Sequence, residues 1–202
     1  MQRVKLETIL DAAYKVFVKF GYQKTSVEDI AKEAMINKGT IYYHFKTKED
    51  IFIAVFSKID ESIRAAIIKK IKKADSFEEK LKVFFTEPFK QFETYHQLTI
   101  NVWNDDLPVF MEKLHDFKLS TIEIMKKLLL EILNEGRDSG VLRENIIKQT
   151  EEITEIIFRF FNHARNFDKL KINEMVLRES MHKSLLFYDI LIHGLVKKET
   201  NQ

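Results

Sequence analysis

The sequence predicts an all-α protein. Only five glycines and two prolines occur among its 202 residues, so few positions would interrupt a helix. Apolar residues recur three and four apart along most of the chain, which is the spacing of an amphipathic helix. We expect an N-terminal three-helix domain, residues 1–47, joined by a long helix to a helical domain that fills residues 48–202.

The first helix is predicted by an apolar stripe at helical spacing. The stripe consists of Leu6, Leu10, Ala13, Phe17 and Phe20. Gly21 is expected to end this helix, because glycine is the usual residue just beyond a helix C-terminus. Tyr22 follows and is expected to close over the helix as a hydrophobic clasp.

Two short helices separated by a short turn are predicted next. Thr25 is expected to cap the first of them, with Glu28 completing a capping box. Met35 and Ile36 form the turn, and Asn37 is expected to cap the second helix. Two short helices joined in this way are typical of a helix-turn-helix unit.

The second short helix carries an unusual outer face. Ile41 and Phe45 are four residues apart and are expected to point inward. The remaining positions lie mostly outside: Lys38, Gly39, Thr40, Tyr42, Tyr43 and His44. The alternative is an ordinary solvated face, which seldom holds two adjacent tyrosines, a histidine and a lysine. Such groups suit phosphates and base edges, so the face predicts double-stranded DNA as a partner.

These positions resemble the tetracycline-repressor (TetR) family of transcription regulators. The resemblance covers roughly residues 5 to 55 and rests on Phe17, Phe20-Gly21-Tyr22, Thr25-Ser26-Val27, Ile30-Ala31, Ala34, the run from Lys38 to Lys46, and Lys48-Glu49. One departure lies in the turn, where the family usually has glycine and this chain has Met35. If the backbone is left-handed there, methionine carries a strain of roughly 1 kcal/mol.

The expected DNA contacts follow from residue type and from the resemblance. They are Thr25, Ser26, Asn37, Lys38, Gly39, Thr40, Tyr42, Tyr43, His44 and Lys48. Lys38 and Thr40 are placed for base edges, and the glycine lets the helix approach the major groove closely. Hydroxyl groups and amides at helix N-termini suit phosphates. Two such helices in a homodimer would enter major grooves about 34 Å apart on a palindromic operator.

The rest of the chain predicts further helices. We expect them at about 48–73, 76–96, 97–105, 106–138, 147–165 and 173–196. Pro88 is expected to kink or divide the second of these. Asp75 or Ser76 is expected to cap it, and Thr47 with Asp50 to start the helix before it.

Aromatic residues are concentrated after residue 50 and suggest a lined apolar cavity for a hydrophobic effector. The candidates are Phe84, Phe85, Phe89, Phe92, Trp103, Phe110 and Phe117, with His96, Asn101 and Asn104 as polar groups that could orient a ligand. The alternative is that each phenylalanine is ordinary core and that the polar groups have surface or capping roles.

Two apolar stripes in the last helices offer a dimer interface. They are Ile153, Ile156, Phe160 and Ala164, and then Leu177, Met181, Leu185, Tyr188, Ile192 and Leu195. Both stripes could instead serve only the internal core. The resemblance implies that these helices pair with their symmetry mates into a four-helix interface.

Several classes of protein fit the sequence poorly. The chain has no cysteine, which excludes disulfides and thiolate metal sites. Its six histidines show no ligand spacing, and no glycine-rich phosphate loop or nucleophile elbow occurs, so we expect no cofactor and no enzyme activity. No apolar run approaches the roughly 18 residues of a membrane span, so we expect a cytoplasmic protein.

The predicted function is a ligand-responsive transcription regulator, most simply a repressor that a hydrophobic effector releases from its operator. A helical carrier for a lipophilic ligand is the main alternative, and an enzyme on a helical bundle is a third. The exposed face from Lys38 to His44 separates them, since neither alternative requires it.

Overall fold

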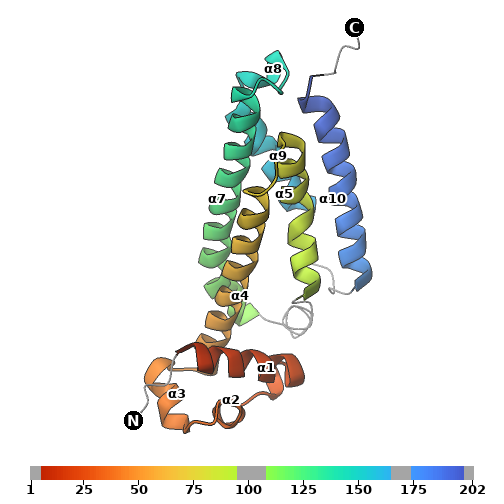
Figure 1. The fold of residues 1–202 in the computed structure, drawn as a ribbon. Helices are drawn as coiled ribbons and strands as arrows, with labels where there is room; N and C mark the ends of the chain where they lie inside the picture. Colours follow the sequence, from red (N-terminus) through yellow and green to blue (C-terminus); the bar gives the residue numbers. More distant parts are fainter. Residues whose placement is uncertain (1–5, 95–107, 165–173, 198–202) are drawn as a thin grey trace. The chain divides into compact units, whose positions relative to one another are not determined.

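The computed structural model describes residues 6–94, 108–164 and 174–197 (Figure 1). The described residues form helices, together with one isolated bridge between Leu142 and Val196, which confirms the all-α prediction. The helices are α1 Leu6–Lys24, α2 Val27–Glu33, α3 Lys38–His44, α4 Lys48–Ile71, α5 Phe77–Thr94, α7 Pro108–Asp138, α8 Glu144–Ile147, α9 Thr150–Ala164 and α10 Glu174–Leu195.

The chain divides into two compact units, each with its own buried core. Among the described residues, the first unit holds residues 6–62 and 108–117, and the second holds residues 63–94, 118–164 and 174–197. The helices α4 and α7 each contribute residues to both units. None of the described helices is both long and apolar enough to span a bilayer.

In the first unit, α1 supplies much of the core. Its buried side chains are Ile9, Leu10, Ala12, Ala13, Val16 and Phe17. The predicted stripe is therefore right in its middle and wrong at both ends, since Leu6 is 46% and Phe20 is 48% exposed. The helix buries a broad face rather than a narrow seam, and this face is centred on Ala13.

Gly21 interrupts α1 instead of ending it. Its backbone angles are φ 77° and ψ 165°, so the helical path is broken there and a short final turn continues to Lys24. The break places the ring of Tyr22 over the core. The Tyr22 ring centroid lies 5.9 Å from that of Phe17 and 5.2 Å from that of Phe52, which confirms the predicted clasp.

In the second unit, α5 and α10 pack side by side (Figure 1). Phe84 and Phe85 are fully buried between the helices of this core. Two hydrogen bonds join the backbone of α5 to side chains of α10. The Ser184 hydroxyl donates to the Phe85 carbonyl at 2.7 Å, and the Tyr188 hydroxyl donates to the Glu78 carbonyl at 3.1 Å.

The start of α5 agrees with one of the two predicted caps. The Glu79 N–H donates to the Ser76 hydroxyl at 3.1 Å, and the Asp75 N–H donates to the Glu79 carboxylate at 3.1 Å. Pro88 does not divide the helix, which continues to Thr94. Phe85 and Phe89, on either side of the proline, are both buried.

The helix predicted at 147–165 is observed as α9, which starts at Thr150. A short helix that the sequence did not predict, α8, ends just before it at Ile147. The helix predicted at 97–105 lies outside the described residues.

Candidate nucleic-acid interface

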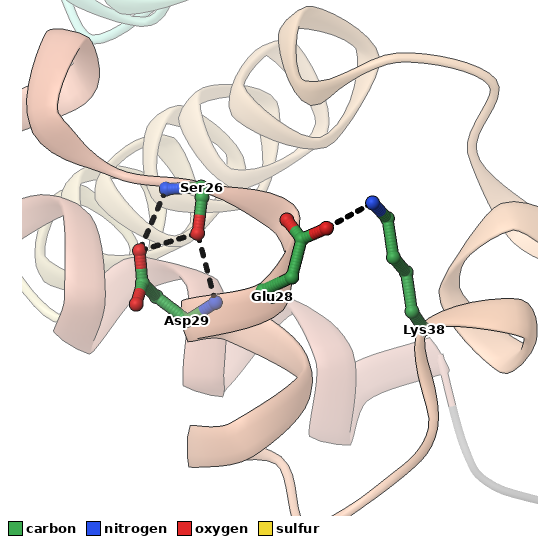
Figure 2. Close-up of polar contacts among 4 residues, drawn as sticks. All are labelled: Ser26, Glu28, Asp29 and Lys38. Carbon is green, nitrogen blue, oxygen red and sulfur yellow. Dashed lines mark hydrogen bonds and ion pairs between the residues drawn. The ribbon is translucent and has the colours of Figure 1, made fainter.

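The corner between α1 and α2 is held by Ser26 and Asp29 (Figure 2). The Ser26 hydroxyl accepts from the Asp29 N–H at 3.1 Å, and the Asp29 carboxylate accepts from the Ser26 N–H at 2.9 Å and from its hydroxyl at 2.5 Å. This is a complete capping box, so the predicted box of Thr25 with Glu28 is wrong by one residue at both positions. Hydrogen bonds from the Ser26 side chain and backbone lower the pKa of the Asp29 carboxyl.

Thr25 stabilises the same corner from the inside. Its side chain is buried, and its hydroxyl donates to the Gly21 carbonyl at 2.7 Å. The expectation that this hydroxyl faces a phosphate is therefore wrong. Ser26 remains partly exposed at the start of α2, with its N–H and hydroxyl donating to the Asp29 carboxylate, and its contact with a phosphate stays a prediction.

The helix α3 begins at the cap that the sequence predicts. The Asn37 side-chain oxygen accepts from the Thr40 N–H at 2.9 Å and from the Thr40 hydroxyl at 3.0 Å. Gly39 is exposed beside this cap, and a Cβ there would lie 3.2 Å from the same oxygen. A side chain at position 39 would therefore crowd the cap as well as the outer surface of the helix.

The outer face of α3 is as exposed as the sequence predicts. Ile41 is fully buried, whereas Tyr42 is 45% and Tyr43 is 83% exposed. His44 is also exposed, and its ring lies edge-on to that of Tyr43 with the centroids 5.1 Å apart. Phenol and imidazole groups in this setting can donate hydrogen bonds to phosphate oxygens.

Lys38, in the first turn of α3, forms an ion pair with Glu28 in the first turn of α2 (Figure 2). Its ammonium also lies 5.4 Å from the centroid of the Tyr42 ring. The hydrogen bond between the two side chains lowers the pKa of Glu28 and raises the pKa of Lys38. Glu28 was not among the residues that the sequence singled out for this surface. The opposite charges in the first turns of two neighbouring helices were the available signal.

Lys48, which the sequence predicts as a phosphate contact, lies against the corner between α1 and α2. Its ammonium donates to the carbonyls of Tyr22 and Thr25, both at 2.8 Å, and lies 4.2 Å from the centroid of the Tyr22 ring. Burial lowers the pKa of this ammonium. In this structure the ammonium of Lys48 stabilises the corner between α1 and α2, and its contact with a phosphate stays a prediction.

The start of α4 confirms the predicted pair of Thr47 and Asp50. The Thr47 N–H donates to the Asp50 carboxylate at 3.1 Å, and the Asp50 N–H donates to the Thr47 hydroxyl at 3.0 Å. The end of the loop that leads into α4 is therefore fixed by local hydrogen bonds.

The described candidates for the effector cavity are core residues. Phe84 and Phe85 are fully buried with ring centroids 5.3 Å apart, and Phe89 is 6% exposed. This placement agrees with the alternative of ordinary core for these three. The other candidates have side chains outside the described part of the structure: Phe92, His96, Asn101, Trp103, Asn104, Phe110 and Phe117.

The α10 stripe predicted for the dimer interface faces largely inward. Tyr188 and Leu195 are buried, and Met181 and Ile192 pack against the core of the second unit. Leu185 is half-buried. The prediction is therefore wrong for Tyr188 and Leu195, because their side of α10 is occupied by α5 and its neighbours within the same chain.

The stripe on α9 that is predicted for the dimer interface is partly buried and partly exposed. Ile153 packs against the core, whereas Ile156 is 61% exposed. Three further exposed apolar residues lie on α10: Met175 at 71%, Leu186 at 53% and Ile190 at 63%. The side chains of Phe160, Ala164 and Leu177 lie outside the described part of the structure.

Among the described residues, no three histidine, aspartate or glutamate side chains lie together as a metal site would require.

The chain matches the family model of bacterial regulatory proteins of the tetR family over residues 9–55. The fatty acid metabolism regulator protein of Bacillus subtilis is 32% identical over 148 residues, which are 72% of this chain and 74% of that protein. The fatty acid degradation regulator FadR from Bacillus halodurans has a solved structure that is 27% identical, with a TM-score of 0.63 and coverage of 95% of this chain and 100% of that one. The structure of FadR from Bacillus subtilis in complex with stearoyl-CoA has a TM-score of 0.58 at 24% identity and covers 94% of this chain and 99% of that one.

Proposed function

Because this chain belongs to the TetR family of bacterial regulatory proteins, which are DNA-binding transcription regulators and not enzymes, we propose that it is a repressor. It binds a palindromic operator as a homodimer, and a hydrophobic small molecule releases it. Residues 1–47 serve as the DNA-reading domain, and residues 48–202 serve as the effector-binding and dimerisation domain.

The observation that carries the DNA-binding role is the exposed aromatic face of α3. Tyr43 is 83% exposed on a helix whose opposite side, at Ile41, is fully buried. Leaving a tyrosine ring in water has no packing benefit, so a binding role accounts for it better than a structural one. Tyr42, Tyr43 and His44 would donate to phosphates, and Lys38 with Thr40 would approach base edges.

Duplex selection from a random pool, followed by titration with salt, tests this role. The logarithm of affinity should fall linearly with the logarithm of salt concentration, because bound phosphates release counterions. Replacing Tyr42 and Tyr43 with alanine should weaken binding by at least tenfold. The matched control is Phe20→Ala, which removes a 48% exposed aromatic ring from α1. Equal effects of the two variants would count against α3 as the reading helix.

The exposed apolar residues of the last two helices support a dimer interface. Leu186 and Ile190 are four apart on α10 and so share a face, and Ile156 of α9 is 61% exposed. Exposed apolar residues grouped in this way are typical of protein–protein contacts. These three replace Tyr188 and Leu195 as the residues that we assign to the interface.

Sedimentation of a charged variant tests the interface. Replacing both Leu186 and Ile190 with glutamate should convert the dimer to a monomer, because unpaired charges would be buried on association. The control is Ile124→Glu, which places one charge at a 42% exposed position of α7. A dimer that survives the double replacement would overturn this assignment.

A fatty-acyl compound is the proposed effector class. Support comes from relatives that are named for fatty acid metabolism and degradation, and from the relative that was solved with stearoyl-CoA. Stearoyl-CoA is therefore the first probe, with free coenzyme A and free stearate as controls. It should release the protein from its selected duplex at concentrations where coenzyme A alone does not.

The same experiments distinguish a carrier from a repressor. A carrier for a lipophilic ligand would bind stearoyl-CoA but would show no salt-dependent binding to any duplex. The exposed face of α3 favours the repressor.

A further inference from the structure

The ion pair between Glu28 and Lys38 places an acid next to the cation that is best placed to reach DNA (Figure 2). Lys38 is in the first turn of α3, next to the cap formed by Asn37 and Thr40. Glu28 belongs to a different helix, so this contact depends on how α2 and α3 pack. A carboxylate on the surface that faces phosphates is unfavourable for binding unless it has a separate purpose.

The folded state does not require this pair. Both side chains are well exposed, at 44% for Lys38 and 59% for Glu28, and exposed pairs contribute little to stability. The start of α2 is already capped by Ser26 and Asp29, and the start of α3 is already capped by Asn37. The pair can therefore open and close without disturbing either helix.

While the pair is closed, the ammonium of Lys38 is neutralised locally. It lies between the Glu28 carboxylate and the Tyr42 ring, which also attracts a cation. A phosphate that approaches α3 then meets a neutral pair instead of a free cation. Opening the pair would free the lysine but leave the Glu28 carboxylate exposed to the same phosphates.

We propose that Glu28 is a specificity-determining residue that withholds Lys38 from random DNA and releases it only to acceptors on the operator's base edges. A guanine edge offers two acceptors, O6 and N7, to one lysine. On any duplex the released carboxylate lies among phosphates, so only a site that gives Lys38 two base acceptors in addition offsets that cost. Glu28 thus lowers non-specific affinity more than operator affinity. This inference rests on the proposed DNA-binding function.

Glu28→Gln tests the proposal on the full-length protein with two probes, a random-sequence duplex and the duplex selected from a pool. The matched control is Asp11→Asn, which removes one carboxylate from the ion pair of Asp11 and Lys58 between α1 and α4. Both variants raise the net charge by the same amount, so they differ only in which lysine they free.

The expected result is a several-fold gain in affinity of Glu28→Gln for the random duplex, with a smaller gain for the selected one. The salt slope on the random duplex should steepen by about one unit, which corresponds to one additional phosphate contact. Asp11→Asn should leave both the slope and the ratio of the two affinities near their wild-type values.

A second variant, Lys38→Met, tests whether the effect of Glu28→Gln acts through Lys38. In a Lys38→Met background, Glu28→Gln should no longer steepen the salt slope, because the cation that it frees is missing. An equal steepening with and without Lys38, or an equal effect of Asp11→Asn, would overturn the role of Glu28. Absence of salt-dependent binding by the wild-type protein would instead contradict the proposed function itself.

Discussion

The ring of Phe77 lies directly against the backbone of Gly136. A Cβ at position 136 would lie 2.6 Å from Cδ2 and 2.7 Å from Cε2 of that ring. The glycine cannot retreat easily, because its carbonyl accepts from the N–H groups of Val141 at 3.1 Å and Leu142 at 3.3 Å. Phe77 is itself buried at the start of α5, so the contact fixes how α5 and the end of α7 approach each other.

Gly136→Ala should therefore destabilise the protein. Alanine is the better helix former by about 1 kcal/mol, but overpacking against a buried ring costs about 1–3 kcal/mol, so the net effect is a loss. Urea unfolding measures it. The control is Gly194→Ala in α10, where an added Cβ would meet nothing within 4 Å and stability should hold or rise. Equal changes in the free energy of unfolding for the two variants would show that the Phe77 ring can move away from position 136 at no cost.

Ser26→Ala should destabilise the corner between α1 and α2. The serine caps α2 and closes the box with Asp29, and loss of such a cap costs about 1 kcal/mol. Thermal unfolding checks this. The neighbouring Thr25→Ser keeps a hydroxyl that can still donate to the Gly21 carbonyl, so it serves as the conservative comparison. A melting temperature of Ser26→Ala equal to that of the wild type would contradict the capping role.

The capping box should also weaken in acid. The pKa of Asp29 is lowered in the folded state by the Ser26 hydrogen bonds, so the carboxylate binds a proton less readily there than in the unfolded chain. The Asp29 carboxylate therefore stabilises the folded state fully at pH values above its unfolded pKa of about 3.9. This stabilisation is lost as the pH falls through its lower folded pKa. Titration of the Asp29 carboxyl carbon by NMR measures the shift. In Ser26→Ala the pKa should move back up, and an unchanged value would argue against this cause.

Lys48→Met should reduce stability while the helices remain intact. The Lys48 ammonium donates hydrogen bonds to the carbonyls of Tyr22 and Thr25. Methionine keeps an apolar side chain near the Tyr22 ring but cannot donate these bonds. A loss of about 1 kcal/mol is expected after discounting for partial exposure to solvent. Urea unfolding of Lys48→Met and of the exposed control Lys46→Met should differ by this amount. If only DNA affinity fell, without loss of stability, a direct phosphate contact by Lys48 would be the better account.

Met35→Gly should stabilise the turn between α2 and α3. Met35 has φ 53°, which is left-handed, and its side chain is 92% exposed, so it gains little from packing. Removing the backbone strain should raise the free energy of unfolding by about 1–2 kcal/mol, and the greater freedom of glycine in the unfolded chain offsets part of this gain. The neighbouring Ala34 has φ −77°, so Ala34→Gly should destabilise the same turn. Thermal unfolding should therefore move in opposite directions for the two variants.

Where hydrogen bonds are local, the sequence predicted them well. Asn37 caps α3 and Thr47 pairs with Asp50 as expected, because each pair is three residues apart and is fixed by the helix start itself. The capping box of α2 was displaced by one residue, to Ser26 and Asp29. Two adjacent hydroxyl residues can both begin a helix, and burial of Thr25 against α1 decides between them.

The placement of Lys48 and of the α10 stripe was not predictable in the same way. A lysine at a helix start looks like a phosphate ligand until the carbonyls of Tyr22 and Thr25 are brought beside it by a chain segment more than 20 residues away. Periodicity likewise shows that Tyr188 shares a face with other apolar residues. It does not show whether that face meets α5 of the same chain or a second copy.

Spacing and residue type along the chain were enough to predict the all-α class, the helix-turn-helix unit and the family. The contacts of Lys48 with the Tyr22 carbonyl and of Glu28 with Lys38, and the burial of Tyr188, became known only from the folded chain. Each of these contacts joins different helices. A one-dimensional pattern assigns a side chain to a face, whereas the packing of one helix on another decides what that face meets.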